Sequence, residues 1–141
     1  MYIEKLLMHV VKNYFCFTKE YTSTSTLAED FFLRSVEKIA SSMGRIIVSG
    51  FVHGVLNTDN FNVTGETFDY GPWRFIEYAN PNFTAAYFDY NRRYSFGSQP
   101  EAALWALTQL GKSLKKFINL DKGLFQTINR YLNDIKKKFK K

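Results

Sequence analysis

Three residues with side-chain oxygens, Asp59, Asn60 and Asp69, lie in one short stretch of the chain. An Asn and an Asp with open coordination positions suit Mg²⁺, which takes one or two protein oxygens and fills the remaining positions with phosphate and water. The pattern indicates a magnesium site with Asn60 and Asp69 as the metal ligands. The alternative is a polar turn in which the same side chains only hold the backbone.

The residues between Asn60 and Asp69 suggest how the two ligands come together. Residues 61–63 and 68–70 have strand character, and Gly65 stands in the turn between them. A hairpin of this length places its two ends side by side. We therefore expect a short β-hairpin with Asn60 and Asp69 at its open end.

The spacing around these residues is that of a kinase catalytic loop. Protein kinases carry H-R-D-x-x-x-x-N followed by D-F-G, and the Asn and the second Asp hold the metals. Here Asn60 lies seven residues after His53, and Asp69 begins a D-Y-G in the place of D-F-G. Val55 occupies the position of the kinase base and cannot accept a proton, which disfavours an ordinary kinase. Asp59 is the nearest carboxylate that could replace it, whereas His53 is expected to hold the loop through hydrogen bonds.

The run G-F-V-H-G-V-L-N-T-D-N at 50–60, followed by D-Y-G-P at 69–72, closely resembles the selenoprotein O family of protein-kinase-like adenylyltransferases. The likeness continues through 93–96, 99–100 and 103–105. The resemblance implies a pseudokinase fold that binds ATP in a reversed orientation. It also implies transfer of AMP, rather than the γ-phosphate, to Ser, Thr or Tyr hydroxyls of other proteins.

Particular residues and partners follow from this resemblance. It implies that Asp59 is the proton acceptor, that Asn60 and Asp69 bind Mg²⁺, and that Asp69 also contacts the nucleotide. ATP and protein substrates are the implied partners. The Gly-rich loop and phosphate-binding Lys of the family find no counterpart here, so we expect 1–141 to be part of a kinase-like catalytic lobe. Such a fragment would be inactive alone and would depend on a separately encoded N-terminal lobe. A non-catalytic remnant and a basic binding module remain as alternatives.

A length of 141 residues with 45% hydrophobic and 18% aromatic content suits one packed domain. The single Cys excludes an internal disulfide framework. No apolar run is long enough to span a membrane, so we expect a cytoplasmic location. Five Lys in the basic tail at 136–141 account for most of the net charge of +6. The nearly neutral remainder disfavours a dedicated nucleic-acid-binding domain.

Hydrophobic periodicity predicts four helices. The first spans 3–15, and the second runs from a capping box at Thr26 to Gly50. The third begins with a capping box at Ser98 and has Pro100 in its first turn, and the fourth spans 122–139. The predicted fold class is therefore mainly α with a small β-hairpin, as a fragment of a protein-kinase-like catalytic lobe.

Two further expectations concern the loop before Ser98 and the helix that follows it. At least one of Arg92 and Arg93 is expected to form a structural ion pair with Asp89 or Glu101. Trp105 is expected in the core.

Overall fold

The computed structural model describes residues 2–15, 20–119, 128–130 and 133. Their architecture is mainly helical with one small antiparallel sheet, which confirms the predicted mainly α content with a small β element. The helices are α1 (Tyr2–Tyr14), α2 (Thr24–Ser49) and α3 (Gln99–Ser113), with short 3₁₀ turns η1 (Thr58–Asn60) and η2 (Phe96–Ser98). The strands are β1 (Phe51–His53) and β2 (Trp73–Phe75).

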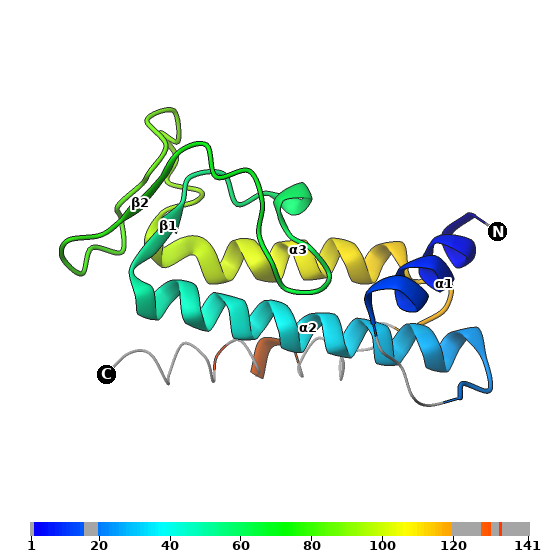
Figure 1. The fold of residues 1–141 in the computed structure, drawn as a ribbon. Coiled ribbons are helices and arrows are strands. Elements are labelled where there is room, and N and C mark those ends of the chain that lie inside the picture. The colour runs from blue at the N-terminus through cyan, green and yellow to red at the C-terminus, as the bar shows by residue number, and fades with distance from the viewer. Residues whose placement is uncertain (1, 16–19, 120–127, 131–132, 134–141) are drawn as a thin grey trace.

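Helices α2 and α3 lie side by side and run in opposite directions (Figure 1). Helix α1 packs near the beginning of α2, and the sheet stands at the opposite end, where α2 finishes and α3 starts (Figure 1). The long helices thus form a rigid support, and the polar loop between β1 and β2 is carried at one end of it.

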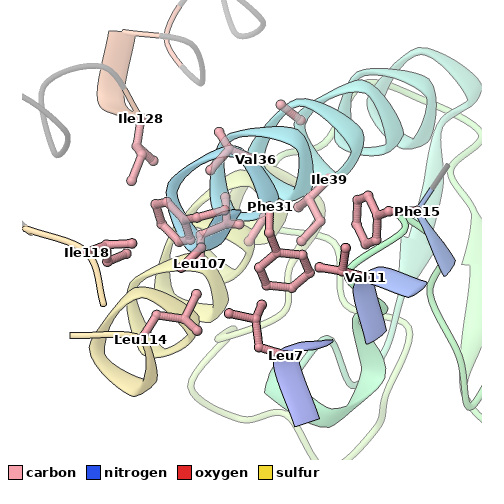
Figure 2. Close-up of a cluster of buried hydrophobic side chains, with 14 of the residues drawn as sticks. Leu7, Val11, Phe15, Phe31, Val36, Ile39, Leu107, Leu114, Ile118 and Ile128 are labelled. Atoms are coloured by element: carbon pink, nitrogen blue, oxygen red, sulfur yellow. The ribbon is translucent and has the colours of Figure 1, made fainter. Parts of the chain in front are cut away.

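Side chains from all three helices meet in one hydrophobic core (Figure 2). Leu7 and Val11 of α1 are buried, as their helical spacing predicts. Burial of an aliphatic or aromatic side chain contributes roughly 1.5–3 kcal/mol, so this cluster is the main source of stability. Its largest members are Leu7, Val11, Phe15, Leu27, Phe31, Phe32, Val36, Ile39, Met43, Leu56, Leu107, Leu114, Ile118 and Ile128.

The start of α2 differs from the prediction. Ser23, not Thr26, is the N-cap, and its side chain accepts a hydrogen bond from the backbone N–H of Thr26 at 3.2 Å. The extended backbone of Ser23 lets its oxygen reach the first turn, so the helix begins earlier than the predicted capping box. The end is confirmed, because Gly50 adopts a left-handed φ of 69° and its N–H bonds the carbonyls of Ile46 and Ile47.

At the start of α3, the N-cap position of Ser98 and the place of Pro100 in the first turn are confirmed. The predicted capping box with Glu101 is wrong, because the Ser98 side chain makes no capping bond. Its hydroxyl instead lies 2.9 Å from that of Ser95 in the preceding loop.

The sheet pairs β1 with β2 in the register Phe51↔Phe75, Val52↔Arg74 and His53↔Trp73. The predicted hairpin over 61–70 is present only as a loop closed by one bridge, Phe61↔Thr67. Regular pairing stops there because the Asn60 N–H bonds the carbonyl of Asn57 and the Phe68 carbonyl bonds the His53 ring, so these two groups do not bond each other. The regular strands therefore form further out than predicted, on either side of the loop.

Some predictions fall on residues outside the described ranges. They are the basic tail at 136–141 and most of the helix predicted over 122–139. Within the described residues, 128–130 are helical and Ile128 is buried in the core. None of the described helices is long and apolar enough to cross a bilayer.

Candidate active site

His53, the last residue of β1, is fully buried at the centre of the predicted site. Its Nδ1 accepts a hydrogen bond from the N–H of Val55 at 3.2 Å. The hydrogen of the neutral ring therefore lies on Nε2, which donates to the carbonyl of Phe68 at 2.6 Å. Burial lowers the pKa of His53, although the Phe68 carbonyl and the charge of Asp69 oppose the shift. The neutral imidazole thus connects the loop after β1 to the segment before Asp69, as expected from the sequence.

Asn60 ends the 3₁₀ turn η1 and is 6% exposed. Its Nδ2 donates to the carbonyl of Val55 at 2.7 Å, and its own backbone carbonyl accepts from Phe68 N at 3.0 Å. No hydrogen bond within the described part of the chain engages Oδ1. The amide is therefore fixed by its nitrogen, and its oxygen is left available as a ligand.

Asp69 follows Phe68 directly, so the Phe68–Asn60 hydrogen bond brings the backbones of Asn60 and Asp69 alongside each other. Asp69 is exposed and has a left-handed φ of 55°, which Asp tolerates better than most residues. One amide oxygen and one carboxylate suit a Mg²⁺ ion whose other ligands are phosphate and water. The residues fit the predicted ion, and the metal assignment itself stays a prediction.

Asp59 precedes Asn60 in η1 and is exposed. Its carboxylate forms no hydrogen bond or ion pair with another residue in the described ranges, and its exposure makes it accessible to an incoming hydroxyl. No cluster of three or more His, Cys, Asp or Glu side chains suited to a metal occurs among the described residues. The role of Asp59 as the base stays a prediction.

Sequence reasoning missed the role of Gln99. This residue opens α3 and is fully buried. Its Oε1 accepts from His53 N at 2.9 Å and its Nε2 donates to Phe51 O at 3.0 Å. Gln99 therefore holds β1 by two backbone contacts. A Gln beside Pro100 at a helix start was the available signal, but nothing local indicated its distant partners.

An aromatic cluster of Phe51, Tyr70, Trp73 and Phe75 covers the outer side of the sheet. The Phe51 ring packs within 6 Å of the other three, with centroid distances of 5.9, 5.9 and 5.5 Å. Tyr70, Trp73 and Phe75 are each about half exposed. A groove of about 840 Å³ runs from this cluster along α2 to Gly65.

The sequence is similar to known proteins of one family. The sequence matches the family described as protein adenylyltransferase SelO over residues 1–141. Its relatives carry the name protein nucleotidyltransferase, so the class of protein is a nucleotidyltransferase. The chain belongs to the protein adenylyltransferase SelO family, and the resemblance drawn from 50–60 and 69–72 is thereby confirmed.

Three relatives named protein nucleotidyltransferase YdiU illustrate the similarity. The protein of Synechocystis is 44% identical over 116 residues, covering 82% of this chain and 24% of the relative. The protein of Trichormus variabilis is 43% identical over 117 residues, covering 83% of this chain and 24% of the relative. The protein of Salmonella paratyphi C is 42% identical over 99 residues, covering 67% of this chain and 20% of the relative. The chain thus spans about a quarter of the length of these relatives.

Proposed function

We propose that this chain is the catalytic-loop segment of a protein adenylyltransferase with a protein-kinase-like catalytic lobe. The enzyme transfers AMP from ATP, with Mg²⁺, to Ser, Thr or Tyr hydroxyls of other proteins. One observation carries the proposal. In a chain of this family, Phe68 bonds both His53 and Asn60, so the predicted metal ligands Asn60 and Asp69 are held alongside each other next to Asp59.

In the proposed reaction, Asp59 takes the proton from the acceptor hydroxyl. The hydroxyl oxygen then forms a bond to the α-phosphorus of ATP, and the bond from that phosphorus to the bridging oxygen breaks, releasing pyrophosphate. Val55 stands where a kinase carries its base, but its backbone is used structurally: its N–H bonds His53 and its carbonyl bonds Asn60. The Val55 side chain cannot accept a proton, so we assign the base role to the exposed carboxylate next to Asn60.

Asn60 and Asp69 would hold Mg²⁺, which neutralises phosphate charge when it is bound. Asn60 contributes its free amide oxygen, and the hydrogen bond to Val55 keeps that oxygen oriented. Asp69 contributes an exposed carboxylate beside the nucleotide phosphates. The buried His53 is the support of both segments and takes no part in proton transfer.

The chain spans about a quarter of its relatives' length, so we propose that it acts together with the remainder of a family-length polypeptide. The exposed aromatic cluster on the sheet suits contact with such a part. By itself the chain binds ATP weakly and transfers no AMP, because nucleotidyl transfer depends on positioning and on charge neutralisation from several sides.

A chimera tests this proposal. The segment of the Synechocystis relative that aligns with this chain is replaced by the chain, and ATP binding is measured by calorimetry with and without Mg²⁺. Asn60→Ala and Asp69→Ala should each weaken the Mg²⁺-dependent binding, whereas Asp59→Asn should leave it nearly unchanged. Mg²⁺-dependent binding that survives Asp69→Ala in a folded chimera would place the metal elsewhere.

A further inference from the structure

A second cavity, of about 550 Å³, opens beside the catalytic loop. One wall is formed by Asn57 and Thr58, which immediately precede Asp59. The opposite wall is formed by Arg92 and Arg93, and Trp105 of α3 adds an apolar surface. Trp105 is 53% exposed, so its predicted place in the core is wrong. We call this cavity the loop pocket.

The loop pocket has an excess of positive charge. Arg92 and Arg93 are exposed, and neither forms an ion pair within the part of the chain that the structure describes. The expected pairing with Asp89 is not formed, because that carboxylate accepts from the backbone N–H groups of Arg93 at 2.9 Å and Tyr94 at 2.8 Å. Glu101 is the one carboxylate among the lining residues. Two guanidinium groups against one carboxylate favour an anionic ligand.

The pocket also contains a hydroxyl that can accept a hydrogen bond. Asn57 Oδ1 has no hydrogen-bond partner among the described residues, but it is buried and closed off from the pocket. Thr58 is exposed and lines the pocket, and a Thr hydroxyl can accept an N–H from a ligand. The loop pocket therefore presents two cationic donors for a carboxylate and one hydroxyl that accepts an N–H.

We infer that the loop pocket binds the acceptor polypeptide, with an acidic side chain near the acceptor hydroxyl on Arg92 and Arg93 and a backbone N–H on the Thr58 hydroxyl. A peptide held in this way passes Thr58 and presents its hydroxyl at Asp59. The inference rests on the proposed function, because that function makes Asp59 the base. It adds a substrate class: acceptor sites flanked by Asp or Glu.

The arginines act as specificity determinants in this account, since they contact the residue next to the acceptor and not the reacting atoms. Nucleotide phosphate is the other anion that two arginines bind. The predicted phosphate-side ligands Asn60 and Asp69 do not line the loop pocket, whereas Thr58, which directly precedes Asp59, does. We therefore assign the pocket to the polypeptide.

Fluorescence anisotropy of the 141-residue chain tests the inference without requiring AMP transfer. Three labelled peptides share one central Ser, flanked by Glu, Ala or Lys. The Glu peptide should bind most tightly, and its affinity should fall as salt is added. Arg92→Glu and Arg93→Glu should each weaken it by about fivefold, the effect of roughly 1 kcal/mol for a partly exposed charge pair. The double variant should prefer the Lys peptide.

Arg74→Glu is the matched control, because Arg74 is an exposed cation on β2 outside the loop pocket. It should leave the order of the peptides unchanged, and circular dichroism should show the same helix content in every variant. Gain of Lys-peptide binding by the double variant cannot come from unfolding, so it supports the pocket directly. Equal affinity for the three peptides, or displacement of the Glu peptide by ATP, would overturn the inference. If the chimera transfers no AMP while the three peptides bind the chain in the predicted order of affinity, the result would instead count against the proposed function.

Discussion

Gln99 Oε1 accepts a hydrogen bond from His53 N at 2.9 Å, across 46 residues of sequence. The same side chain donates to the carbonyl of Phe51. The first residue of α3 therefore fixes the strand that leads into the catalytic loop. Because His53 in turn bonds Phe68, the position of the loop depends on the packing of α3 against the rest of the molecule.

Replacing Gln99 by Ala should destabilise the chain. His53 N and Phe51 O would lose their partners in a buried setting, and each unsatisfied group costs about 1–3 kcal/mol. The free energy of unfolding, measured with urea, should therefore fall by about 2–6 kcal/mol. Gln109→Ala is the control on the same helix, because Gln109 Nε2 already has no partner among the described residues. An equal decrease in unfolding free energy in the two variants would refute the proposed role of Gln99 in holding β1.

Stability should fall as the pH drops below about 6.5, the ordinary pKa of His. Burial lowers the pKa of His53 in the folded chain, so the unfolded chain binds a proton first. This contribution is complete above the unfolded pKa and is lost as the pH falls toward the folded pKa. Unfolding free energies should be measured from pH 7.5 to 5. His53→Gln should flatten this part of the profile, whereas His9→Gln, at an exposed site on α1, should not.

Gly65→Ala should loosen the turn that carries the loop over α2. Gly65 has a φ of 99°, and an added Cβ would lie 2.8 Å from the carbonyl oxygen of Lys38. Strain of this kind costs about 1–3 kcal/mol, which thermal unfolding would record as a lower midpoint. Gly71→Ala is the matched change, because the nearest atom to its Cβ is 3.9 Å away. A larger effect at Gly71 would contradict the described packing.

Asp59→Asn should abolish most of the AMP transfer by the chimera while preserving its fold. Loss of a general base typically lowers the rate about 10²–10⁴-fold. The rate should be compared at saturating ATP, so that a change in nucleotide affinity does not contribute. Glu37→Ala on α2 removes a carboxylate outside η1 and should leave the rate unchanged. Near-full transfer by Asp59→Asn would assign the base role to another group.

The sequence predicted the local features of this fold well. Gly50 ends α2 and Pro100 lies in the first turn of α3, because each depends on backbone preferences of one residue. The spacing from His53 to Asp69 indicated the candidate site, since a loop of fixed length restricts where its ends lie.

The features that the sequence did not predict are contacts between distant segments. The two bonds of Gln99 to β1 and the exposure of Trp105 depend on how α3 packs, which no local pattern encodes. The regular strand pairing also moved outward, because the Asn60 N–H bonds Asn57 and the Phe68 carbonyl bonds the His53 ring in place of each other. Ser23 replaced Thr26 as the cap because the five consecutive hydroxyl residues at 22–26 offer several candidate caps for one helix start.

Label transfer by the chimera tests the central claim most directly. The chimera is incubated with Mg²⁺, a mixture of candidate acceptor proteins and ATP labelled at either the α- or the γ-phosphate. We predict protein-bound label from α-labelled ATP only, dependent on Asp59, Asn60 and Asp69. Label from γ-labelled ATP alone, or α-label that persists after all three residues are replaced, would contradict the assignment of this chain as the catalytic segment of an adenylyltransferase.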